Sequence, residues 1–103
     1  MANQFGDRVR QLREEQKLLL RQVAPLLEMD TPMLSKIERG ERTAKREQVM
    51  KFAKVMKVAK DELLTLWLAD QIIDVTQNED LALKAMQVAE DEIKYRKSKK
   101  KSN

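Results

Sequence analysis

The 103-residue sequence contains no cysteine and no histidine. Without cysteine there are no disulfides and no thiolate metal sites, and without histidine the commonest catalytic base and metal ligand are also missing. The two glycines form no phosphate-binding loop, and the carboxylates are scattered along expected solvated helix faces. We therefore expect no catalytic residues, no metal and no cofactor, and so not an enzyme.

Long apolar runs are absent as well. No stretch approaches the ~20 apolar residues that a membrane-spanning helix requires. The segment Met1–Asp7 has no charged run followed by an apolar one, so we expect no signal peptide. The expected location is the cytoplasm, with no membrane partner.

Glycine, proline and aromatic residues are scarce, whereas 42% of the residues are hydrophobic and 37% are charged. Few β-branched and aromatic residues and few helix breakers favour helices over sheet. The length suits one domain with a real core. We therefore expect an all-α fold.

The net charge of +4 is unevenly distributed along the chain. Residues 1–64 carry 14 Lys and Arg against 10 acids, residues 65–93 carry one Lys against seven acids, and residues 94–103 carry six Lys and Arg and no acid. A basic front, an acidic middle and a basic end indicate different partners for different parts of the chain.

Apolar residues recur at helical spacing and predict six helices. The first three cover about residues 5–16, 20–27 and 31–38. Pro25 should kink the second or delay its start, Asp30 should cap the third, and Gly40 should end it. We expect Thr43 to cap the fourth helix, Asp61 and Glu62 to lie in the first turn of the fifth, and Asn78 to cap the sixth.

Two short helices joined by about three residues have the spacing of a helix-turn-helix, whose second helix lies in the DNA major groove. Val23-Ala24 and the run from Leu34 to Arg42 (LSKIERGER), followed by Phe52–Val58 and Glu62-Leu63-Leu64, resemble the Cro/phage-repressor-type helix-turn-helix family over about residues 5–66. The resemblance implies a five-helix DNA-binding domain over residues 1–66. Residues 67–97 would form a helical extension and residues 98–103 a disordered basic tail.

The resemblance also implies which residues contact DNA. Base contacts map to Thr31, Pro32, Met33 and Lys36. Lys36 is the candidate for a hydrogen bond to guanine, or alternatively meets only phosphate. Phosphate contacts map to Arg39, Arg42, Lys45 and Arg46, with Arg21 and Arg8 as flanking candidates. Because this set of base-contacting residues is unusually apolar and poor in Gln, Asn and Arg, we expect few direct hydrogen bonds to bases and more recognition of DNA shape.

Similar proteins pair an arginine on the first helix with a glutamate at the end of the third, which implies a partly buried ion pair between Arg13 and Glu38. Alternatively, both are solvated charges on helix surfaces. Three positions depart from the family pattern. Leu19 replaces the usual helix cap, Leu20 a frequent glutamine, and Glu28 the turn glycine. Glu28 either adopts a left-handed conformation at a cost of about 1 kcal/mol or the turn differs in shape.

The extension holds the single tryptophan and further apolar residues at helical spacing. We expect it to form a homodimer through Trp67, Leu68, Ile72, Ile73 and Met86, since regulators of this kind pair across a two-fold axis. Alternatively, the extension folds back and completes the core of one chain. The basic end, residues 94–101, reaches DNA or serves only as a solubilising end.

These observations favour a sequence-specific, nucleoid-associated bacterial regulator, a repressor or operon controller acting on an inverted repeat of double-stranded DNA. The first alternative is an antitoxin whose extension binds a partner toxin, and neighbouring genes distinguish the two. A second alternative is a bridging protein that binds other proteins and has little affinity for duplex DNA.

Overall fold

The computed structural model describes residues 2–101 of the chain, and within them every regular element is helical. The elements are α1 (Gln4–Glu15), α2 (Leu20–Val23), a 3₁₀ helix η1 (Ala24–Leu27), α3 (Thr31–Glu38), α4 (Arg46–Met56), α5 (Lys60–Thr76) and α6 (Ala82–Lys101). The expected all-α fold is confirmed. No helix in this part of the chain combines the length and hydropathy needed to cross a bilayer.

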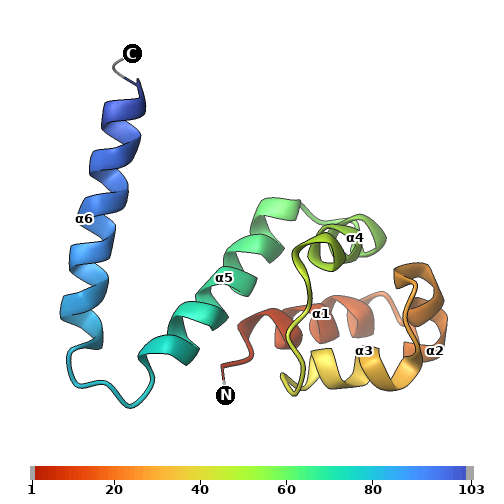
Figure 1. Ribbon diagram of the computed structural model, residues 1–103. Helices are drawn as coiled ribbons and strands as arrows, with labels where there is room; N and C mark the ends of the chain where they lie inside the picture. Colours follow the sequence, from red (N-terminus) through yellow and green to blue (C-terminus); the bar gives the residue numbers. More distant parts are fainter. Residues whose placement is uncertain (1, 102–103) are drawn as a thin grey trace.

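Helices α1 to α4 and the first half of α5 pack around one core (Figure 1). Phe5 and Phe52 meet edge to face at its centre, with ring centroids 5.3 Å apart. Gln16 Nε2 donates to the carbonyl of Met56 at 2.9 Å and so joins the end of α1 to the end of α4. The core includes Val9, Leu12, Val23, Ala24, Leu27, Leu34, Ile37, Val49, Met56 and Leu63.

The second helix changes its hydrogen-bonding pattern where proline enters. The α-helical turn ends at Val23, and residues Ala24–Leu27 continue as a 3₁₀ helix with Pro25 in its first turn. A proline in a first turn removes no needed N–H. The expected disturbance at Pro25 is therefore present, and it leaves Ala24 and Leu27 buried in the core.

Two expected helix caps are wrong. Thr43 does not cap α4, because the chain stays extended through Lys45, which allows Ala44 to be buried. The Lys45 N–H instead donates to Oε1 of Gln48 at 2.8 Å. Asn78 does not cap α6 either. It adopts a left-handed conformation with φ 68°, which asparagine tolerates, and the helix begins only at Ala82.

The basic end is not a disordered tail over residues 98–101, because α6 continues to Lys101. Lys94 and Arg96 pair with Glu90 and Glu92 one turn earlier, at 3.7 and 3.0 Å. Such i,i+4 pairs support a helix, and basic residues in its last turns complement its dipole. Residues 102 and 103, the end of the expected tail, lie outside the described residues.

The last helix stands apart from the packed body. Figure 1 shows α5 extending beyond α1 and α4, and α6 turning away from it after a short connection. Every described side chain of α6 is exposed except that of Ala82, which is half-buried. The chain therefore consists of a compact helical body and an outlying helix.

Candidate nucleic-acid interface

The helical pair α2–η1 and α3 is joined by the three residues Glu28–Asp30, the spacing of a helix-turn-helix. Glu28 adopts the left-handed conformation expected at a family glycine, with φ 56°. Its carboxylate bonds the ammonium of Lys51 on α4, and that bond holds the pKa of Glu28 below its usual value. Asp30 caps α3, since Oδ1 accepts the backbone N–H of Met33 at 2.8 Å.

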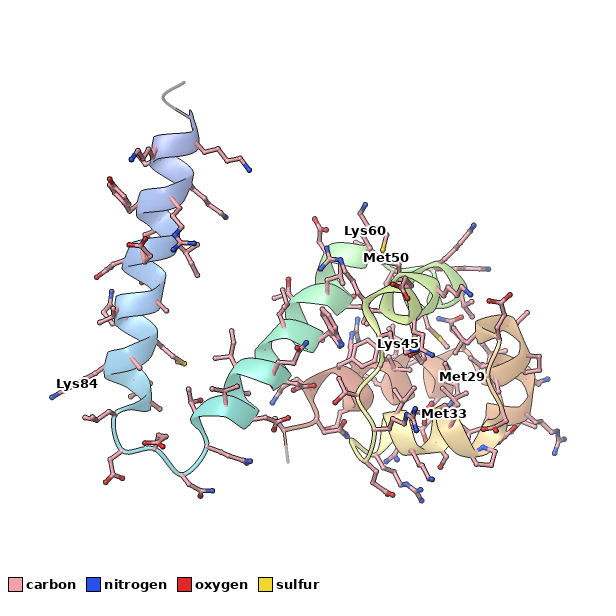
Figure 2. All side chains as sticks on the ribbon, in the orientation of Figure 1. Met29, Met33, Lys45, Met50, Lys60 and Lys84 are labelled. Carbon is pink, nitrogen blue, oxygen red and sulfur yellow. The ribbon has the colours of Figure 1, made fainter. Side chains whose placement is uncertain are left out.

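Helix α3 has one face in the core and one facing outward. Leu34, Ile37 and Glu38 are buried, whereas Pro32 and Lys36 are exposed. Thr31 and Met33 are half-buried, and Met33 packs in part against the core. Figure 2 labels Met33 on α3 and Met29 in the preceding turn, and Met29 also packs in part against the core. All four residues with expected base contacts thus keep some exposed surface on α3, and Lys36 is the one long polar side chain among them.

The orientation of α3 depends on a buried carboxylate at its end. Glu38 is 2% exposed, and its two oxygens accept hydrogen bonds from Nε and Nη2 of Arg13 on α1 at 2.7 and 2.9 Å. Arg13 also donates to the carbonyl of Leu18 at 2.8 Å, and Arg10 lies 3.6 Å from Glu38. The hydrogen bonds to Glu38 raise the pKa of Arg13. This network fixes α3 against α1.

The start of α1 also contacts α3. Asn3 Nδ2 donates to the carbonyl of Glu38 at 2.8 Å, so it satisfies one of the free carbonyls at the end of α3. Gly6 makes this approach possible, because a Cβ there would lie 2.6 Å from the carbonyl oxygens of Ile37 and Glu38. Gly40, with φ 76°, then turns the chain away from α3.

A residue of α5 caps α1 from a distance. The carboxylate of Asp70 accepts the backbone N–H groups of Gln4 and Phe5 at 2.8 and 3.0 Å. Asp74 accepts from Ala2 N at 3.3 Å. A carboxylate at a helix N-terminus satisfies free donors and interacts favourably with the dipole. Asp70 therefore joins the extension to the end of α1 that holds α3.

The expected phosphate-binding residues are exposed on α2, at the end of α3 and on the connection to α4. Arg39 pairs with Glu41 at 2.7 Å, an exposed pair that contributes little and can open. Arg8 instead pairs with Glu62 of α5 at 3.1 Å, which places it between helices. Within residues 2–101, no ion pair engages the remaining candidates, Arg21, Lys36, Arg42, Lys45 and Arg46.

The residues expected to form a dimer surface separate into two groups. Trp67 packs partly against the core, and its Nε1 donates to the carbonyl of Ala44 at 2.7 Å. Trp67 is therefore partly occupied by contacts within its own chain. Leu68, Ile72, Ile73 and Met86 are exposed apolar residues on α5 and α6.

The comparison with family models gives a match to a helix-turn-helix domain over residues 4–66, more than half of the chain. The chain belongs to this helix-turn-helix family. The resemblance to Cro and phage repressors is thereby confirmed, and the coarse function that the domain supports is DNA binding in regulation. No curated protein and no solved structure matches the chain.

Three residues that position the recognition helix α3 were not found from the sequence. Asn3 directly precedes the first helix, so from the sequence it looks like an ordinary helix cap. Gly6 lies in the first turn of that helix, where it looks like a glycine that the helix merely tolerates. Asp70 looks like any acidic residue on a solvated helix face. Their partners are 35 or more residues away for Asn3 and Asp70, which local periodicity cannot reveal.

Proposed function

We propose that the protein is a sequence-specific transcriptional regulator, a repressor or operon controller, that binds an inverted-repeat operator as a homodimer. The observation that carries the proposal is the recognition helix α3, which buries Leu34 and Ile37 and leaves Lys36 exposed. Among residues 2–101, the basic candidates Arg42, Lys45 and Arg46 on the following segment take part in no ion pair. A helix held in this way can enter the major groove while the flanking charges meet phosphates.

The proposed roles divide between reading bases and neutralising phosphates. Lys36 donates to guanine O6 and N7, and Thr31, Pro32 and Met33 contribute mainly apolar contacts, including contacts to thymine methyl groups. Arg39, Arg42, Lys45, Arg46 and Arg21 contact the backbone. One such unit binds a half-site weakly, and this is why a two-fold pair is proposed.

Binding to a random-sequence duplex library at two salt concentrations tests this proposal. We expect the wild type to enrich an inverted repeat. Lys36→Ala should relax one base position in each half-site, at about 1–3 kcal/mol of discrimination. Arg42→Ala should weaken all sites alike and reduce the slope of log K against log salt by about one unit.

Lys84→Ala is the matched control, since it also removes one positive charge. Lys84 is exposed and extends from α6 away from the helical body (Figure 2). It should change neither the enriched sequence nor the salt slope. Absence of binding to any duplex at low salt would refute the DNA-binding role, and a protein-bridging function would then replace it.

An antitoxin is the second candidate, and the exposed apolar residues of α5 and α6 favour it because a partner toxin could cover them. Such a protein would still regulate its operon through α3. Purification after co-expression with the products of the neighbouring genes separates the candidates. A stable complex with a small toxin supports the antitoxin, whereas a methyltransferase or nuclease gene as neighbour supports the operon controller.

A further inference from the structure

An open apolar groove lies between α5 and α6, which form a V (Figure 1). Its volume is ≈ 360 Å³. Thr76 at its edge donates its hydroxyl to the carbonyl of Ile72 at 2.7 Å, so it requires no polar partner. The apolar walls are formed by Leu68, Ile72, Val75, Ala85, Met86 and Ala89. An occupant of this groove must therefore present apolar side chains.

Helix α6 buries little apolar surface against the rest of its own chain. It has 20 residues, yet its described side chains beyond Ala82 are exposed. Most helical stability in proteins comes from packing of an apolar face. Ala82, Ala85, Met86, Ala89 and Ile93 recur at intervals of three and four and form such a face. This face includes one wall of the groove.

The charges beside this face change sign along the chain. The connection before α6 contains the acids Glu79 and Asp80 and no Lys or Arg, whereas Asp70 and Asp74 on α5 accept hydrogen bonds from the start of α1. Residues 94–101 contain six Lys and Arg and no acid. Within the described residues Glu79 and Asp80 take part in no ion pair. A surface that is acidic at one end and basic at the other is complementary to a reversed copy of itself.

We propose that α6 of a second copy fills this groove and lies antiparallel to α6 of the first. The proposal rests on the homodimer proposed above and gives its geometry. When the segments 82–93 of the two copies overlap fully in antiparallel orientation, Ala82 of one copy lies opposite Ile93 of the other. Met86 of one copy then lies opposite Ala89 of the other. The same arrangement brings the end of each α6, with Arg96, toward the connection before the other α6, which holds Glu79. Arg96 pairs with Glu92 of its own helix at 3.0 Å, so Glu79 of the second copy would be an additional partner.

The opposite, parallel arrangement is disfavoured by charge. It would set the six basic residues of one α6 beside the same six of the other, and like charges across an interface cost free energy. A two-fold axis perpendicular to α6 produces the antiparallel pair and makes the same residues meet from both sides. The alanines at positions 82, 85 and 89 allow the two helices to approach closely.

Crosslinking of single cysteines tests the geometry, and the chain has no cysteine of its own. The variants Ala82→Cys and Ile93→Cys are prepared on chains of different mass, mixed, and treated with a short bis-maleimide. We expect a crosslinked heterodimer of the two chains. Neither variant alone should crosslink, because antiparallel pairing sets each cysteine far from its own copy. Sedimentation of the untreated full chain should show a dimer.

Self-crosslinking of each variant alone would indicate parallel pairing and overturn the proposal. A monomer that still binds a DNA half-site would also overturn it while leaving DNA recognition intact, and the groove would then belong to another protein. If the wild type neither dimerises nor binds DNA, the proposed function itself is refuted. Circular dichroism of the two variants shows whether they fold.

Charge reversal gives a second, independent measurement. Glu79→Lys should weaken the dimer by about 2- to 30-fold. Because of the two-fold axis, the substitution removes two exposed ion pairs of about 0.2–1 kcal/mol each. Arg96→Glu in the same chain should restore the affinity, since the pair is then reversed. If Arg96→Glu weakens the Glu79→Lys dimer further, Glu79 and Arg96 do not face each other and the proposed alignment is wrong.

Discussion

Arg13 on α1 and Glu38 at the end of α3 form a bidentate pair, with Nε and Nη2 of the guanidinium 2.7 and 2.9 Å from the two carboxylate oxygens. Arg13 is 12% and Glu38 2% exposed, so the pair is largely desolvated. Removing one partner of such a pair leaves a buried charge without compensation. Breaking the pair by removing one partner should therefore cost stability.

Arg13→Met should lower the free energy of unfolding by about 3 kcal/mol, because Glu38 then keeps only Arg10, at 3.6 Å. The double variant Arg13→Met, Glu38→Met should be more stable than the sum of the single losses predicts, since no charge remains buried. Urea unfolding of the two single variants and the double variant measures this coupling. Strictly additive losses would show that the two side chains act independently.

Asp70→Asn should destabilise the protein by about 1 kcal/mol, because an amide oxygen replaces a carboxylate that accepts two N–H groups at the start of α1. Amide exchange should accelerate at Gln4 and Phe5. Asp74→Asn is the matched control, since its single contact with Ala2 is longer, at 3.3 Å. Equal effects of both substitutions would mean that the capping geometry does not matter.

Gly6→Ala should cost about 1–3 kcal/mol, because its new methyl group would meet backbone oxygens of α3 at 2.6 Å. The backbone cannot move aside as a flexible side chain can, so α1 and the end of α3 must separate. Thermal unfolding measures the loss. Glu15→Ala, an exposed change on the same helix, should stay within about 0.5 kcal/mol. An unchanged melting temperature for Gly6→Ala would contradict the close approach.

Trp67→Phe should cost about 1 kcal/mol through loss of the hydrogen bond to Ala44. Because Trp67 is the single tryptophan, its fluorescence reports on this site alone. The emission maximum should stay constant as the protein is diluted through dimer dissociation, since the indole packs within one chain. A red shift on dilution would instead place Trp67 at the dimer surface, as expected from the sequence.

The sequence predicted helix bounds correctly where neighbouring residues alone determine them. The sequence predicts a helix over residues 31–38, and the structure gives the same bounds because Asp30 and Gly40 mark its ends through their own chemistry. Thr43 and Asn78 are residue types that often cap helices, but neither caps one here. At Thr43 the reason is the burial of Ala44, and at Asn78 it is the left-handed turn conformation. The end of α6 was missed because the composition of residues 98–103 is that of a tail, whereas the helix continues to Lys101.

The positioning of the candidate site could be predicted only in part. The Arg13–Glu38 pair followed from a family resemblance, since nothing in the spacing of two residues 25 positions apart requires it. The contacts of Asn3 and Asp70 had no such guide. They depend on how close α1, α3 and α5 approach, which is determined by Gly6 and by the whole core.

The first turn of α3 has a consequence for how a phosphate can be held there. Helix N-termini ordinarily bind anions through free backbone N–H groups. In α3, Pro32 has no N–H, and the N–H of Met33 already donates to the negatively charged Asp30. A phosphate that approaches this end finds one carboxylate and few donors. In the proposed complex, long basic side chains therefore provide the electrostatic attraction, and we expect the affinity for DNA to fall as salt rises.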